Sequence, residues 1–312
     1  MWVQESTPTF YLARMSFPLE SSFQMSEGLD HPLKSSSLGA RLTVFRVLAV
    51  LAAILLSLPA DFAQVGFPRN ALWEVVHNVC VPGQLLRHDP KPCLQVDLTA
   101  GIENGFAILR DPRGGTQFLL VPTARIPGIE SPTIRGENAA NYFASAWEVR
   151  TQIDDALHRK LPRDDIGLAI NSVVSRSQDQ LHIHFSCIRS DVAEALHENE
   201  AKIGNHWAPF NVPLVGHRYV AIWVQGRHLG PHNPFRLLSE ELPGTTRDIG
   251  NRTLVVIGMT RIDGIEGFVI LADQVNRNSG DLASGEELLD TACHIATAGK
   301  MTNFGLIEPR TD

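Results

Sequence analysis

The chain has 312 residues, of which 44% are hydrophobic and 20% charged, and its formal net charge is −7. This composition is that of a globular protein with enough apolar side chain for one large core or two smaller ones. Lys and Arg number 27 against 34 Asp and Glu, and no basic cluster is interleaved with aromatic residues. Because nucleic-acid binders carry such a cluster, we expect no nucleic-acid partner.

The N-terminal region contains a candidate targeting segment. Residues 1–40 are rich in Ser and Pro and have no helical or strand period, so we expect a disordered extension. An uncharged apolar run follows at 47–58, and with its flanks it approaches the about 20 residues of a membrane span. We therefore predict a membrane anchor at 41–63, with a cleaved signal peptide as the alternative. Both place the remaining chain across a membrane, whereas a short core helix would not.

Four cysteines follow the apolar run. An even number in an exported domain favours disulfides over free thiols. Three pairings are possible, and we favour Cys80 with Cys93, because a local bridge would close the Pro/Gly-rich loop expected at 81–92. Cys187 would then pair with Cys293. The spacings suit zinc poorly, since no CxxC occurs.

The first half of the folded region shows four expected elements. Apolar spacing predicts a short helix at 71–79, and a hairpin is expected at 105–122 around a Pro/Gly turn. The segment 123–132 is too rich in breakers for regular structure, and Arg125 is its only base. A long amphipathic helix is predicted at 141–161.

Two antiparallel strands are predicted next. An apolar strand at 166–174 leads through a turn at 176–179 into a second strand at 180–187. This pairing would hold Asn171 near the second strand, in which polar and apolar residues alternate. One face of that strand carries Gln180, His182, His184 and Ser186. Such a polar row indicates either a functional site or an exposed face.

The C-terminal part predicts a helix and a second hairpin. Asp191, three residues before Glu194, resembles a capping box, and the backbone N–H groups of the helix start would favour an anion. Strands at 252–262 and 267–272 form the second hairpin. Because it faintly repeats the first one, it hints at two related halves.

Three interpretations of the two histidines are open. As metal ligands, His182 and His184 would need a third ligand, for which His217, Asp179 and His158 are available without a distinctive spacing. They are otherwise histidines without chemistry, in the core or on an exposed face. The third interpretation is nucleophilic attack on phosphorus, because a neutral imidazole is a good nucleophile and its neighbour can bind phosphate oxygens.

The histidine strand resembles the histidine-triad superfamily, whose motif is His-φ-His-φ-His-φ-φ. The middle histidine, which becomes nucleotidylated, corresponds to His182 and the third to His184, while Gln180 replaces the first. Asn171 stands roughly where the superfamily has an asparagine. The resemblance implies an α+β fold at 70–312, a histidine-triad-like antiparallel sheet with flanking helices. It also implies a homodimer, unless one chain holds both halves.

A combination of longer segments resembles bacterial CDP-diacylglycerol pyrophosphatase over about residues 70 to 295. The matching segments are Cys-Val-Pro at 80–82, LLVPTARIPGIESP at 119–132, LAINS at 168–172, HIHFSCIR at 182–189 and Gly-His at 216–217. The resemblance implies hydrolysis of CDP-diacylglycerol to CMP and phosphatidate without a cofactor or metal. It also implies a single-pass inner-membrane protein with its catalytic domain on the periplasmic side, which meets its lipid substrate in the bilayer.

The resemblance implies roles for seven residues. His182 would attack the cytidylyl phosphorus, and water would then release CMP. The supporting residues would be His184 and Ser186 at the phosphate oxygens, Gln180 and Asn171 beside the nucleophile, Arg125 at the substrate, and His217 as acid for the leaving group. Two other functions stay open, namely a metal-dependent hydrolase that uses the HxH pair and a membrane-tethered module that binds a nucleotide or lipid head group.

Overall fold

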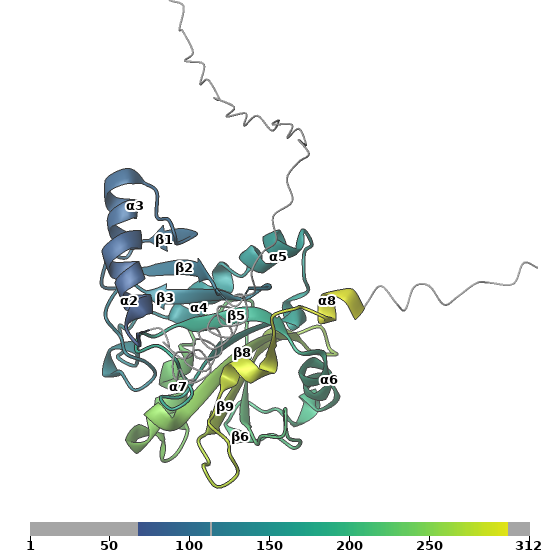
Figure 1. Cartoon of the computed structure of the whole chain (residues 1–312). Coiled ribbons are helices and arrows are strands. Elements are labelled where there is room, and N and C mark those ends of the chain that lie inside the picture. Colours follow the sequence, from purple (N-terminus) through teal and green to yellow (C-terminus); the bar gives the residue numbers. More distant parts are fainter. Residues whose placement is uncertain (1–67, 113, 299–312) are drawn as a thin grey trace, which may run out of the picture. The chain divides into compact units, whose positions relative to one another are not determined.

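The computed structural model describes residues 68–112 and 114–298, which belong to one compact unit that begins at Gly66 (Figure 1). The predicted extension at 1–40 and the predicted span at 41–63 lie outside the described residues.

A ten-stranded sheet, antiparallel at every pairing, forms the centre of the unit (Figure 1). The strands are β1 (Gln95–Asp97), β2 (Phe106–Arg110), β3 (Phe118–Pro122), β4 (Ile166–Ile170), β5 (Ile183–Ile188), β6 (Ala208–Pro209), β7 (Val220–Gln225), β8 (Arg252–Thr260), β9 (Glu266–Gln274) and β10 (Leu289–Asp290). Their order is β1-β2-β3-β5-β4-β8-β9-β7-β6, with β10 paired to β5. The sheet and its helices confirm the α+β class.

Apart from β1 at one edge, the sheet repeats one pattern when it is followed inward from either edge: two strands in chain order are followed by the next two in reverse order. From one side β2-β3 precede β5-β4, and from the other β6-β7 precede β9-β8. Each set consists of two antiparallel pairs with helical structure between them in the chain. The two sets meet where β4 pairs with β8.

Both predicted hairpins are present, and the two predicted central strands are shorter than predicted. The hairpins are β2–β3 and β8–β9, and the second turns through Gly264 in the left-handed region, at φ +81°. The strand predicted at 166–174 ends at Ile170, and the one predicted at 180–187 begins at Ile183. His182 therefore precedes its strand instead of lying within it.

The first helical segment is longer than predicted. α2 (Ala71–Val75) continues through the π-helical turn η2 (Val76–Cys80) into α3 (Val81–Arg87). The loop predicted at 81–92 is thus helical over its first half. Pro82 is accommodated because it lies in the first turn of α3, directly after a π turn that already interrupts the regular hydrogen-bond pattern.

The helix predicted at 141–161 is divided in two. α4 (Tyr142–Glu148) is followed by its C-cap Val149, and α5 (Thr151–Leu157) by its C-cap His158, whose φ of 50° is left-handed. The chain therefore leaves the helix before it reaches Pro162. The remaining helices are α6 (Ser190–Glu198), α7 (Pro234–Glu241) and α8 (Ile295–Ala298).

The predicted anion site at the start of α6 is not part of the histidine site. Asp191 caps no distant N–H group, because it pairs with Arg189 and accepts from the N–H of Val192. α6 follows the C-terminal end of β5, whereas His182 precedes its N-terminal end. The six residues of β5 separate the two by about 20 Å at 3.3 Å per residue.

The two faces of the sheet are covered differently. One face carries a single large core, in which Phe185 packs with residues of α4, α5 and α7. The second face carries two separate cores, one with Leu119 beneath α2 and α3 and one with Ala169 beneath α6. His184 pairs with Leu119 on one side and with Ala169 on the other. The polar row of β5 therefore lies on the strip between the two cores.

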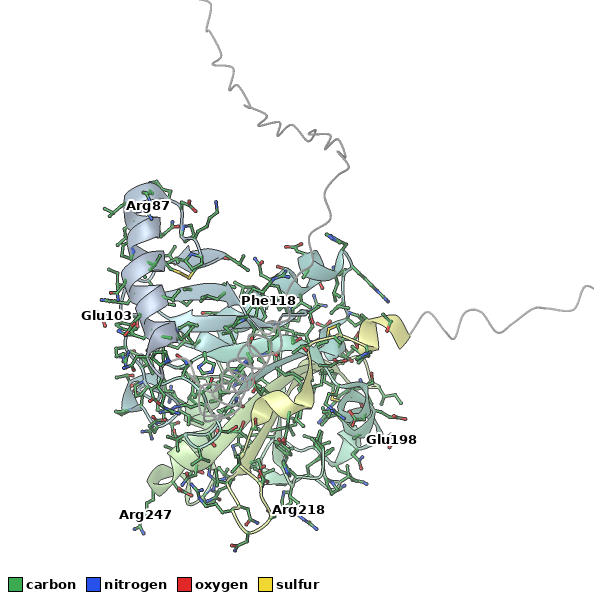
Figure 2. The ribbon with its side chains drawn as sticks, in the orientation of Figure 1. Arg87, Glu103, Phe118, Glu198, Arg218 and Arg247 are labelled. Atoms are coloured by element: carbon green, nitrogen blue, oxygen red, sulfur yellow. A yellow bond between two sulfur atoms is a disulfide. The ribbon has the colours of Figure 1, made fainter. Side chains whose placement is uncertain are left out.

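Two disulfides join distant parts of the unit. Cys80 of η2 is bonded to Cys93, and Cys187 of β5 is bonded to Cys293 before α8. This is the pairing that the sequence analysis favoured. Figure 2 places charged side chains such as Glu198 at the periphery of the unit.

The predicted localisation requires a correction. Within 68–112 and 114–298, no helix has both the length and the apolar character needed to cross a membrane. This finding contradicts the prediction of a single-pass inner-membrane protein with a periplasmic catalytic domain. The segment on which that prediction rested, 41–63, lies outside the described residues.

Candidate active site

His182 is held in a defined tautomer. Its Nδ1 lies 2.7 Å from the carbonyl oxygen of Gln180. A carbonyl oxygen can only accept a hydrogen bond, so Nδ1 carries the proton and Nε2 keeps its lone pair. The chain makes this contact because His182 and Gln180 precede β5, where the backbone carbonyl of Gln180 is not engaged in the strand ladder.

The surroundings of His182 favour the neutral ring. The residue is only 7% exposed, and burial lowers the pKa of His182 below its usual value despite the opposing hydrogen bond to Gln180 and the charge of Glu286. The ring of His184 lies edge-on, with the two centroids 4.9 Å apart. His182 is thus a buried, neutral imidazole beside a second imidazole.

His184 is surrounded by polar groups that the sequence did not indicate. Its Nδ1 lies 2.6 Å from Nε2 of Gln117, 3.2 Å from Glu286 Oε2 and 3.9 Å from Asp111 Oδ2. Gln117 also donates to Asp111 over 3.0 Å, which orients its amide. Two carboxylates therefore lie beside Nδ1 and would stabilise positive charge on the ring.

Asn171 reaches this site through Glu286. Its side-chain oxygen accepts from the backbone N–H of Glu286 at 3.2 Å and from the hydroxyl of Ser284 at 3.4 Å. Asn171 therefore holds the segment from which Glu286 extends to His184. The predicted nearness of Asn171 to the histidines is realised by this contact with a third segment.

Gln180 uses its amide on the backbone. The side chain is fully buried, accepts from the N–H of Ile126, and donates to the carbonyls of Pro122 and Ala124 over 3.0 and 2.8 Å. These bonds attach the loop after β3 to the residue two before His182. The predicted role of holding the nucleophile agrees with this position, whereas direct binding of substrate stays a prediction.

Ser186 follows His184 by two residues on the same face of β5. The Ser186 hydroxyl is fully buried, 3.1 Å from Thr116 Oγ1 and donating to the carbonyl of Asp290. It lies about 7 Å along the strand from His184 and about 13 Å from His182, which precedes the strand. Phosphate binding by Ser186 stays a prediction that this enclosure disfavours.

Arg125 lies at the rim of a cavity of about 380 Å³. Its guanidinium stacks on Trp73 of α2 at 5.3 Å and donates to Asn70. Tyr142 of α4 lines the same cavity, as do residues of the loop that Gln180 holds. Arg125 is therefore placed to contact a ligand that enters from this side.

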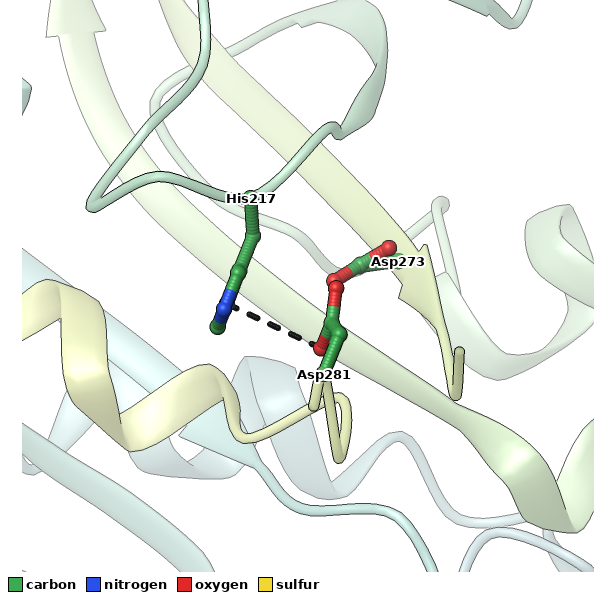
Figure 3. A group of neighbouring side chains, drawn as sticks. All are labelled: His217, Asp273 and Asp281. Atoms are coloured by element: carbon green, nitrogen blue, oxygen red, sulfur yellow. Dashed lines mark ion pairs between the residues drawn. The ribbon is translucent and has the colours of Figure 1, made fainter. Parts of the chain in front are cut away.

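His217 belongs to a different group of side chains. Its Nδ1 lies 2.7 Å from Glu287 and 3.6 Å from Asp281, and Asp273 is adjacent (Figure 3). Burial by itself would lower the pKa of His217, but the hydrogen bond to Glu287 and the neighbouring carboxylates outweigh it and raise that pKa. The role as leaving-group acid stays a prediction.

Sequence reasoning missed Asp111, Gln117 and Glu286. Asp111 was assigned to a turn, and Glu286 lies about 100 residues after His184. No spacing pattern joins them. They meet because β3 pairs with β5 and because Asn171 holds the segment that carries Glu286.

The α+β domain thus holds a buried histidine pair in which one ring keeps a lone pair and the other is flanked by carboxylates, a combination of groups suited to chemistry at phosphorus. The chain belongs to the CDP-diacylglycerol pyrophosphatase family, whose match covers residues 67–297. A CDP-diacylglycerol pyrophosphatase from Yersinia pestis is 37% identical over 226 residues, which are 72% of this chain and 84% of that protein. The predicted family is thus confirmed.

Proposed function

We propose that the protein hydrolyses CDP-diacylglycerol to CMP and phosphatidate through a nucleotidyl intermediate on His182. The overall reaction rests on membership of the family. The route through His182 rests on one observation, the hydrogen bond from its Nδ1 to the Gln180 carbonyl, which leaves Nε2 as the nucleophilic atom.

The reaction would proceed in two displacements. In the first, Nε2 of His182 attacks the cytidylyl phosphorus, a P–N bond forms, and phosphatidate leaves with the bridging oxygen. In the second, water attacks the same phosphorus, the P–N bond breaks, and CMP departs. The water proton returns to solvent, so His182 ends neutral as it began.

His184 would stabilise the charge that develops on the phosphoryl oxygens. Its ring stands beside that of His182, and Glu286 and Asp111 compensate positive charge at its Nδ1. A donor preorganised in this way acts chiefly in the transition state. Asn171 supports the arrangement by holding Glu286.

The cavity beside Arg125 would receive part of the nucleotide. It is lined by Trp73, on which Arg125 already stacks, by the buried Tyr142, and by the loop that Gln180 attaches to the nucleophile segment. The guanidinium of Arg125 can bind phosphate oxygens.

The mechanism is tested by trapping the intermediate. Wild-type protein is mixed with CDP-diacylglycerol and quenched within milliseconds, and the tryptic peptide that contains His182 is examined for an added CMP. We expect the adduct on wild type, and neither adduct nor turnover with His182→Gln. The matched control is His197→Gln on α6, which should behave as wild type. Robust turnover by His182→Gln would overturn the nucleophile assignment.

We further infer that the chain holds two related halves of a histidine-triad-like fold. The support is the strand order, in which two sets of two antiparallel pairs meet at β4 and β8. One chain would then supply what the superfamily builds from two, so a homodimer is not needed for the site. A monomer by sedimentation at working enzyme concentration with full activity is the expected result.

Contact with a lipid surface would occur on the side of α3. Apolar side chains are exposed there, with Leu86 at 77%, near Leu85 and Leu94. They would meet the interface where the acyl chains of the substrate lie. Leu86→Ser should reduce cosedimentation with phosphatidylglycerol vesicles, whereas Ile262→Ser, in the turn between β8 and β9 and equally apolar, should not. Equal binding by both variants would contradict this contact.

A further inference from the structure

A second group of ligating side chains lies on the second face of the sheet, apart from the histidine pair. Asp273 is the last but one residue of β9, Asp281 follows in the next loop, and His217 comes from the turn before β7 (Figure 3). In the register, Asp273 pairs with Thr253 of β8. The three residues thus come from three segments that only the fold brings together.

The geometry of this group converges on one point. One ligand atom from each residue lies within 4.8 Å of the other two. An ion at their centre would be at most about 2.8 Å from each atom, and small side-chain rotations would reach the metal–ligand distances of about 2.0–2.2 Å.

The two carboxylates are buried together, and within the described residues neither forms an ion pair with Lys or Arg, although the charge of Arg252 acts on Asp273 from farther away. Asp273 is 8% exposed and Asp281 is 5% exposed. Oδ1 of Asp273 accepts from the N–H of Gln274, and its Oδ2 is buried and, apart from the neighbouring Asp281 carboxyl, meets no hydrogen-bond partner in the described part of the chain. Two buried carboxylates side by side are costly unless a positive charge compensates them. A carboxylate oxygen of Asp273 is directed toward Asp281 in Figure 3.

We propose that His217, Asp273 and Asp281 bind a divalent transition-metal cation such as Zn²⁺. One imidazole nitrogen with two carboxylate oxygens suits Zn²⁺, whereas Ca²⁺ and Mg²⁺ prefer ligand sets made of oxygen alone. Nothing in the hydrolytic mechanism at His182 uses this cation.

Glu287 would complete the site. Its Oε1 now accepts from Nδ1 of His217 at 2.7 Å and from the hydroxyl of Tyr219 at 2.9 Å. A cation bound to Nδ1 takes the place of the proton there, which is released to solvent, and meets the Glu287 carboxylate at the same position. Tyr219 would keep that carboxylate oriented.

The cation would stabilise the segment that serves the active site. Asp281 and Glu287 bracket the stretch that contains Ser284 and Glu286, and Glu286 contacts His184. Fixing both ends of the stretch to β9 and to the turn before β7 restricts its motion. The cation therefore acts by position, and the chemistry stays with the histidine pair.

The test measures binding directly. Protein stripped with chelator is dialysed against Zn²⁺, and the bound metal per chain and the midpoint of thermal unfolding are determined. We expect one Zn²⁺ per wild-type chain and a higher midpoint. The double variant Asp273→Asn/Asp281→Asn should bind none and lose the zinc-dependent shift, while His217→Gln, which removes a direct ligand, should weaken binding by at least the about 10–100-fold that loss of an outer-shell partner costs. Glu198→Gln, an exposed residue of α6, is the matched control and should bind as wild type.

The isosteric Asn substitutions remove buried negative charge, so the metal-free double variant should unfold at no lower a temperature than metal-free wild type. This separates loss of a ligand from loss of the fold. Zinc retention by the double variant at the wild-type level, or no retention by wild type, would overturn the proposal. His182→Gln should retain zinc, so the outcome is independent of the proposed mechanism.

Discussion

The carbonyl oxygen of Gln180 lies 2.7 Å from Nδ1 of His182, and it fixes which nitrogen of the ring is free to react. The contact spans two residues at the entry to β5. It therefore follows from the backbone conformation there, and a side-chain substitution at Gln180 would not remove the carbonyl itself.

The acid limb of the pH profile should lie low. Burial lowers the pKa of His182, so the neutral nucleophile persists below the usual histidine pKa of about 6.5. As pH falls from 7, kcat/KM should stay level past 6.5 and decline only below it. Steady-state rates from pH 5 to 8 on the wild-type protein test this. A decline centred at or above 6.5 would contradict a neutral buried nucleophile.

Glu286→Gln should lower kcat. The substitution keeps the shape of the side chain but removes the charge 3.2 Å from Nδ1 of His184. Because that charge would matter most as the phosphoryl oxygens gain charge, we expect a loss of about 10–100-fold in kcat with a smaller change in KM. Glu194→Gln on the exposed side of α6 is the control. A change in KM alone would instead assign Glu286 to ground-state binding.

Gln180→Ala should destabilise the fold. It leaves the buried backbone groups of Pro122, Ala124 and Ile126 without their present partners. An unsatisfied buried group costs about 1–3 kcal/mol, so we expect a total loss of about 2–4 kcal/mol after relaxation. Urea unfolding followed by tryptophan fluorescence measures it. Unchanged stability with lost activity would show that Gln180 contacts substrate instead.

The two disulfides should contribute unequally. The bond between Cys187 and Cys293 closes a separation of 106 residues, and the bond between Cys80 and Cys93 one of 13. On the chain-entropy model, their removal costs about 5 and about 3 kcal/mol. Paired Cys→Ala variants compared by urea unfolding under oxidising conditions test the order. A larger loss from the local pair would show that packing outweighs loop entropy.

Local pattern was sufficient for much of the sheet. Alternation and turn chemistry located both hairpins, because strand faces and glycine turns depend on near neighbours in the chain. Alternation also placed His182 and His184 on one strand face, and the resemblance to the superfamily motif then singled them out. The helix from Ala71 was under-predicted, because Pro82 and Gly83 normally mark a loop and only the preceding π turn accommodates them.

The sequence by itself determined the family and the α+β class, and it indicated His182 and His184 as candidate site residues. Each of these signals lies in short contiguous segments of the chain. Only the tertiary structure decided the surroundings of the two histidines. Asp111, Gln117 and Glu286 reach His184 through strand pairing and a distant segment, and His217 joins Asp273 and Asp281 in another group. These contacts depend on the strand order β3-β5-β4-β8-β9, in which residues as far apart in the chain as Gly167 and Ile257 become neighbours, and no local pattern encodes such an order.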